Sequence, residues 1–183
     1  MFESNAYILQ QNESWNNLSP RERESKAQAV QLYNNARFQG KLNKVLASLS
    51  GRTRHLLNLH KVEAASRVTG RHYAGIQTVR IDRIRGSEGR EEDFDTNFYP
   101  LHGRSRGRWM SIARAAMEHK GLPPVELIQI GQDYFVRDGH HRISVAHILG
   151  QEAIEAEVTV WQVSRSLPAC EPAGATCLAA QAV

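Results

Sequence analysis

Ionisable side chains are concentrated in one short stretch of the chain. An acid, a glycine, two imidazoles, a guanidinium and a hydroxyl lie close together in Asp138, Gly139, His140, His141, Arg142 and Ser144. An unperturbed imidazole titrates near neutral pH, so His140 and His141 are candidate general acids or bases. A guanidinium binds phosphate through several N–H donors. These residue types predict a site that handles phosphate, and a surface turn with solvated polar groups is the alternative.

The elements around this stretch would hold its side chains at the start of a helix. Tyr134–Val136 has the character of a short apolar strand, and Asp138-Gly139 is typical of a turn. The apolar residues Ile143, Ala146 and Leu149 then fall on one helix face. A helix N-terminus presents unpaired backbone N–H groups and the positive end of the helix dipole, and both attract anions. The expected phosphate-binding residues of this corner are Asp138, Gly139, His141, Arg142 and Ser144.

The remaining pattern indicates an α+β domain preceded by helices. Apolar alternation predicts a strand near residues 76–81 and another near 154–160, and residues 125–136 have the pattern of a hairpin. A stripe from Trp109 to Met117 predicts a helix between them. Upstream, Ser19-Pro20 is expected to start a helix that Gly40 ends, followed by a second helix over Lys41–Leu49. Residues 56–62 are expected to be helical or irregular.

These patterns divide the chain into four parts. Residues 1–18 are expected to be a loosely ordered N-terminus, residues 19–72 a helical extension, residues 73–163 the α+β domain and residues 164–183 a flexible tail. The helices of the extension offer a surface for a protein partner or for a homodimer. Within the domain, the charged segment 86–95 directly follows a strand region. Such loops often carry site residues, although a plain exposed turn is nearly as common.

Composition and charge narrow the classes of partner. The chain is 41% hydrophobic and 23% charged, which is ordinary for a soluble globular protein, and its net charge is +4. Residues 1–75 carry 11 basic and 5 acidic side chains, so a polyanion such as DNA would be bound most naturally there. The candidate DNA contacts are Arg52, Arg54, Arg104 and Arg106.

Targeting and cysteine patterns give further expectations. The sequence shows neither a signal pattern nor an apolar run long enough for a bilayer, so a cytoplasmic protein without membrane contact is expected. Cys170 and Cys177 both fall in the tail and predict neither a zinc site nor a disulfide framework.

The order of these pieces resembles the N-terminal domain of ParB partition proteins and the related sulfiredoxin fold. The similarity covers about Ile76 to Trp161. Asp138 to Arg142 looks like the Gly-x-His-Arg phosphate-binding turn of that superfamily, and Arg90 with Phe94-Asp95 stands where ParB proteins carry Pro-Arg followed by Phe-Asp. The resemblance implies a small mixed sheet flanked by helices.

Two departures from the superfamily limit what the resemblance implies. Sulfiredoxins carry a catalytic cysteine where this chain has His140, and no cysteine lies in the domain, so thiolate chemistry is excluded. ParB proteins continue into a DNA-reading domain after this fold, whereas here the additional helices precede it. Small stand-alone members of the superfamily bind or hydrolyse nucleotides, act as nucleases or phosphorylate a free amino acid.

Three functions are compatible with these observations. In the first, the protein hydrolyses nucleotides or cleaves DNA. The turn binds the phosphates of ATP or CTP, and Arg90 supplies a second cation. Glu88 or Asp138 holds a divalent metal such as Mg²⁺. In the second, Glu88 is the base of a kinase similar to free-serine kinases. In the third, the protein is a nucleotide-dependent regulator or inhibitor without turnover. His141 is as well suited to a structural hydrogen bond as to catalysis.

Overall fold

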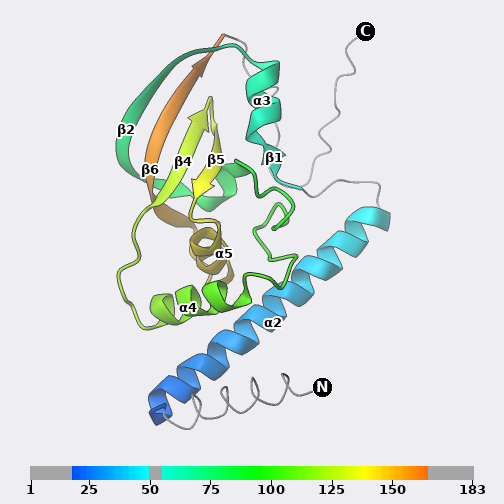
Figure 1. Cartoon of the computed structure of the whole chain (residues 1–183), viewed down its shortest axis with the longest axis vertical. Coiled ribbons are helices and arrows are strands. Elements are labelled where there is room, and N and C mark those ends of the chain that lie inside the picture. Colours follow the sequence, from blue (N-terminus) through cyan, green and yellow to red (C-terminus); the bar gives the residue numbers. More distant parts are fainter. Residues whose placement is uncertain (1–17, 50–54, 165–183) are drawn as a thin grey trace, which may run out of the picture.

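The computed structural model describes residues 18–49 and 55–164, and these form an α+β fold around a six-stranded mixed sheet (Figure 1). The α+β class is thereby confirmed. The strands, in the spatial order β1-β3-β5-β4-β6-β2, are β1 (Leu57–Asn58), β3 (Ile84–Ser87), β5 (Asp133–Asp138), β4 (Val125–Ile130), β6 (Ala153–Val163) and β2 (Val68–Arg80). The helices are α2 (Pro20–Leu49), α3 (Leu59–Ala65), α4 (Arg106–Met117) and α5 (His140–Ile148), with a short 3-10 helix at Ile81–Arg83.

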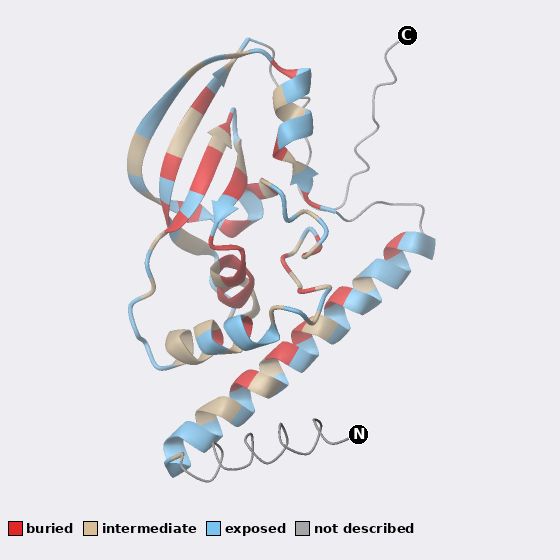
Figure 2. Cartoon of the chain, in the orientation of Figure 1, coloured by how far each residue is buried: buried red, intermediate tan, exposed pale blue. Residues whose placement is uncertain are grey.

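The sheet is covered on both faces because its central strands are apolar on both sides. Neighbouring residues of a strand point to opposite faces. In β5, Val136 packs with Ile143 of α5, whereas Phe135 packs with Leu59 of α3. A third apolar cluster, which contains Tyr33, Trp109 and Val145, joins α2, α4 and α5. The helices α5, α4 and α2 therefore form successive layers on one face (Figures 1 and 2).

Helix α2 is continuous from Pro20 to Leu49, so the expected break at Gly40 is wrong. A Cβ atom on residue 40 would lie 3.1 Å from the Cβ of Tyr99 and 3.2 Å from the carbonyl oxygen of Pro100. The glycine therefore lets α2 pack closely against Tyr99 and Pro100, and this packing outweighs the poor helix propensity of glycine. The predicted start is confirmed, because the Ser19 hydroxyl accepts from the Glu22 N–H while the Glu22 carboxylate accepts from the Ser19 N–H.

A buried carboxylate connects α2 to the segment after β3. Asp95 is 2% exposed and accepts a hydrogen bond from the Asn43 side chain of α2. It also accepts from the backbone N–H groups of Asn97 and Tyr99. Because these donors come both from the helix and from the segment itself, Asp95 fixes this irregular segment against the long helix.

Two elements begin earlier or differ in type from the sequence expectation. Strand β2 starts at Val68, so the expected boundary at residue 72 between the helical extension and the α+β domain lies inside this strand. The first half of β2 pairs with the end of β6, for example Val68 with Val163. Leu57 and Asn58 form a short strand parallel to β3 and not a helix, because the sheet edge offers them backbone partners. The hairpin of β4 and β5 is confirmed.

Several sequence predictions lie outside the described residues. They concern the loosely ordered start of the chain, the flexible tail with Cys170 and Cys177, and the DNA candidates Arg52 and Arg54. Among the helices that the structure does describe, none is both long and apolar enough to cross a membrane.

We expect Gly86→Ala to destabilise the fold by about 2–3 kcal/mol, because overpacking a closed site forces the surrounding atoms apart. A Cβ atom on residue 86 of β3 would lie 2.1 Å from the Phe135 ring and 2.7 Å from the Leu57 carbonyl oxygen. Gly107→Ala is the matched control: nothing lies near that position in α4, so alanine should stabilise by about 0.5–1 kcal/mol. Urea unfolding of both variants measures the difference, and equal stabilities would contradict the packing at β3.

Candidate anion-binding site

The predicted strand–turn–helix corner is present between β5 and α5. Gly139 has a φ of 98°, in the left-handed region that favours glycine, and it is the N-cap residue of α5. A Cβ atom there would lie 2.5 Å from the Val125 side chain, so the position is closed to other residues on steric grounds as well. The backbone N–H groups of the first turn of α5 begin directly after it, at His140.

Side chains from three segments line a hollow of about 240 Å³, part of which is open to solvent, at the start of α5. Its walls are Asp138, Gly139, His140, His141 and Arg142 of the corner, Arg90 of the segment after β3, and Arg108 and Ile112 of α4. The structure thus brings Arg90 to the corner, as expected. Arg108 was missed by sequence reasoning, although it stands one turn before Ile112 on a helix whose core stripe was recognised.

His140 is a buried connector between three segments. Its Nε2 atom lies 2.7 Å from the hydroxyl oxygen of Ser87, the last residue of β3. That hydroxyl also accepts the backbone N–H of Arg90, at 3.0 Å. The serine O–H can then donate a hydrogen bond to the imidazole, and a neutral His140 accepts this bond at Nε2. The ring also stacks on Phe94 with a centroid distance of 6.0 Å. His140 therefore fixes the backbone from which Arg90 projects.

His141 is buried in a different way. It is 4% exposed and makes an edge contact with Phe94, with ring centroids 5.5 Å apart. Its Nε2 atom is buried and has no hydrogen-bond partner within the described residues. Since buried polar atoms are nearly always paired, an orphaned nitrogen at the wall of a cationic hollow is unusual.

Both imidazoles are neutral at physiological pH. Burial and then the positive charge of Arg90 lower the pKa of His140 to about 4, with His141 adding to the shift and Asp138 opposing it. Burial, Arg90 and Arg108 likewise lower the pKa of His141 to about 4, against the weaker effects of Asp93 and Asp138. A neutral imidazole can accept a proton or donate one N–H bond, but it adds no charge to the site.

Arg142 is used to build the corner. One guanidinium nitrogen donates to the carbonyl oxygens of Pro123 and Pro124, at 2.7 and 2.8 Å, and the other donates to the Asp138 carboxylate at 2.6 Å. Its side chain is 12% exposed. These bonds tie the segment before β4 to the first turn of α5. Phosphate binding by Arg142 and Asp138 stays a prediction, because most of their hydrogen-bonding capacity is directed at each other and at this segment.

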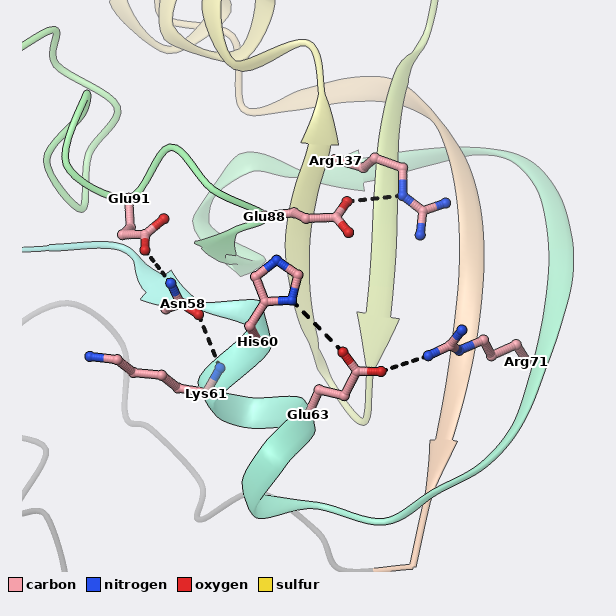
Figure 3. A network of polar contacts seen from close by, with 8 residues as sticks. All are labelled: Asn58, His60, Lys61, Glu63, Arg71, Glu88, Glu91 and Arg137. Atoms are coloured by element: carbon pink, nitrogen blue, oxygen red, sulfur yellow. Dashed lines mark hydrogen bonds and ion pairs between the residues drawn. The ribbon is translucent and has the colours of Figure 1, made fainter.

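Ser144 and Glu88 do not line the hollow. Ser144 is fully buried in the second turn of α5, where its hydroxyl accepts the indole N–H of Trp109 at 2.9 Å. Glu88 pairs with Arg137 at 3.1 Å (Figure 3). Arg137 and Asp138 are neighbours on one strand and point to opposite faces of the sheet, so Glu88 is directed away from the histidines.

Among the described residues, the expected metal and DNA candidates each contact another side chain of the protein. Within residues 18–49 and 55–164, no three His, Cys, Asp or Glu side chains are grouped so that they could hold a metal ion. Glu88 and Asp138 each have an arginine partner instead. Arg104 pairs with Asp93, and Arg106 lies over the Tyr33 ring at 5.8 Å from its centroid.

Comparisons with known proteins include one distant likeness among solved structures. A scan of protein-family models and a search among curated proteins each found no match. Among solved structures, the chain is similar to sulfiredoxin from Arabidopsis thaliana, with 18% sequence identity and a TM-score of 0.33 over 45% of this chain and 82% of that chain. A likeness at this level bears on the fold alone, so the chemistry of the hollow has to be argued from its own residues.

We expect the free energy of unfolding to fall as the pH is lowered from about 7 to about 4.5. The unfolded histidines titrate near 6.5 but the folded ones at about 4, so the unfolded state binds more protons between these values. The stabilisation is therefore complete above about pH 6.5 and is lost as the pH approaches 4; for His140 it is on the order of 3 kcal/mol. Urea unfolding at several pH values measures this loss.

The variant His141→Gln isolates one of the two groups. It should take up about one proton fewer on unfolding near pH 5 than the parent protein. A stability profile that is unchanged by this substitution would contradict the assignment of a low pKa to His141.

We also expect Arg142→Ala to lower the free energy of unfolding by about 2–3 kcal/mol, because three hydrogen bonds of a largely buried guanidinium are lost. Arg137→Ala is the control, since that side chain is 41% exposed and its ion pair with Glu88 should contribute less than about 1 kcal/mol. Thermal and urea unfolding measure both changes. Equal, small losses would show that the bonds to Pro123 and Pro124 contribute little.

Proposed function

We propose that this protein binds the phosphate groups of a nucleoside triphosphate, ATP or CTP, in the hollow at the start of α5. The observation that carries the proposal is a hollow lined by Arg90, Arg108 and His141, because the buried Nε2 atom of His141 has no partner among the described residues. In the tautomer protonated at Nε2, His141 donates to a phosphate oxygen while the two guanidinium groups neutralise its charge.

The charge balance of the hollow supports an anionic ligand. Arg90 and Arg108 are exposed, and neither forms an ion pair with another described residue. The one carboxylate of the lining, Asp138, is held by Arg142. The first-turn N–H groups of α5 add the positive end of a helix dipole. The hollow is small, so a bound nucleotide would place phosphate oxygens at its mouth, with the sugar and base outside it.

Binding without turnover is the function that the geometry supports best. A kinase mechanism with Glu88 as base is disfavoured, because that carboxylate pairs with Arg137 away from the hollow. Nucleotide hydrolysis or DNA cleavage is the second candidate. It is favoured by one observation, the neutral imidazole of His141, which could accept a proton from an attacking water. Mg²⁺ would then have to be brought by the nucleotide, since the described residues offer it no ligand group.

We expect Arg108→Ala to weaken binding of ATP or CTP at least tenfold in calorimetric titration, because a charged hydrogen bond to phosphate is lost. Arg106→Ala, on the same helix but directed over Tyr33, is the matched control and should change the affinity less than twofold. Inorganic tripolyphosphate should bind where the nucleotides bind, if phosphate recognition dominates. Absence of binding to all three compounds, or equal effects of the two substitutions, would overturn the proposal.

A turnover assay separates the two candidate functions. The protein is incubated with Mg²⁺ and ATP, CTP or plasmid DNA, and released phosphate or nicked DNA is measured. Binding with no product supports a regulatory role. Product that is formed by the parent protein and lost in His141→Ala, with nucleotide affinity retained within about tenfold, would make hydrolysis the function.

A further inference from the structure

The second half of α2 carries an apolar surface that no described part of the chain covers. It consists of the side chains of Phe38, Leu42, Val45, Leu46 and Leu49, which are 41% to 80% exposed and are called the α2 stripe below. Groups of large exposed apolar side chains on soluble proteins commonly mark interaction sites. The stripe is three helical turns long, and polar residues occupy the same face on its N-terminal side, at Gln31 and Asn35.

The α2 stripe points directly away from the body of the protein. Successive residues of a helix are rotated by about 100°, which places the stripe roughly opposite the buried side of α2. That buried side consists of Ala29, Tyr33, Ala36, Gly40 and Ala47. Figure 2 shows these buried positions along the edge of α2 that meets the other elements. A partner could therefore approach the stripe without meeting the rest of the domain.

We propose that the α2 stripe is the interface of a homodimer in which two copies of α2 pack antiparallel. Phe38, Leu42, Val45 and Leu49 are separated by four, three and four residues, which is the spacing of an a/d seam. This spacing is the same in both directions. A two-fold axis between Leu42 and Val45 therefore sets Leu42 against Val45 of the second copy, and Phe38 against its Leu49, so that the two patches are self-complementary.

The width and shape of the stripe favour a second helix as its occupant. The apolar residues span about 100° of the helix surface, and four of the five follow the a/d spacing of a helix pair. An open hollow of about 510 Å³ lies beside Phe38, between Asn34, Arg37 and Lys41. In the antiparallel arrangement this hollow receives Leu49 of the second copy, which is 80% exposed.

The area predicts a weak dimer. A phenylalanine side chain can bury about 150–250 Å², so five partly exposed side chains offer on the order of 400–500 Å² per copy. The pair would bury on the order of 1,000 Å², which is the lower limit for a specific interface. We expect reversible association with a dissociation constant on the order of 10–100 µM.

The charges beside the stripe predict how salt acts on the dimer. No acidic residue occurs between Lys26 and Lys61, and Lys41 is exposed at the edge of the stripe, next to Leu42. Pairing two copies brings these like charges together, and salt screens such repulsion. Association should therefore strengthen from about 0.05 to about 0.5 M NaCl. Binding of nucleic acid or of an acidic partner helix would weaken over the same range.

The test uses sedimentation of the full-length chain under reducing conditions. Leu42→Glu and Val45→Lys should each be monomeric, because either change places an unpaired charge in the seam. An equimolar mixture of the two variants should dimerise again. The antiparallel register sets the introduced carboxylate of one copy against the introduced ammonium group of the other, and it leaves the unchanged Val45 and Leu42 in contact on the other side of the axis. Ile76→Glu is the matched control: Ile76 is 62% exposed on β2, and the same change there should leave the dimer intact.

Each outcome decides the proposal. Dimerisation that strengthens with salt, is lost in both stripe variants and returns on mixing supports it. A monomer at all concentrations, loss of the dimer in Ile76→Glu alone, or a failure of the mixed variants to associate would overturn it. Circular dichroism of each variant confirms that the α2 substitutions, which lie on exposed positions, leave the fold unchanged.

Discussion

The hydroxyl of Ser87 is the contact on which the candidate site depends. It joins the end of β3 to His140 at the start of α5 and, through the Arg90 N–H, to the segment that supplies one wall of the hollow. With the serine hydroxyl as donor, the bond uses the Nε2 lone pair of a neutral imidazole. Burial in an apolar environment beside Phe94 provides that condition, since desolvation disfavours the charged ring. The strand order of the sheet makes the contact available, because β3 and β5 are neighbours.

Positive charge and burial act together in the hollow. Arg90 and Arg108 repel a proton from the histidines, and the histidines in turn leave the two guanidinium groups as the cations that meet solvent. An anion entering the hollow would meet two exposed guanidinium groups, while the Asp138 carboxylate there is already paired with Arg142. The same arrangement makes the corner sensitive to acid, because burial and the nearby guanidinium groups hold the pKa of both histidines at about 4.

The sequence was informative where short-range rules apply and failed where register or packing decides. The strand–turn–helix corner followed from apolar spacing and from a glycine at the turn, whereas the approach of Arg90 was implied by the resemblance to ParB proteins. The charge of Glu88 makes it a candidate base or metal ligand, but the face of the sheet on which it lies depends on strand register, which the sequence alone does not determine. Ser144 was assigned to phosphate, yet one helical turn carries it into contact with Trp109. Arg108 was overlooked because its helix had been interpreted as core alone.

The bond between Asn43 and Asp95 makes the long helix part of the site architecture. Asp95 follows Phe94, whose ring contacts both histidines, so a side chain of α2 fixes the same loop that presents Arg90. A shortened chain that lacks α2 would keep its sheet, but Asp95 would lose the side chain of Asn43 as a partner. The apolar cluster around Trp109 would lose the residues that α2 contributes, such as Tyr33. The N-terminal helix is therefore a support of the loop rather than an independent appendage, and any engineered version of the domain should retain it.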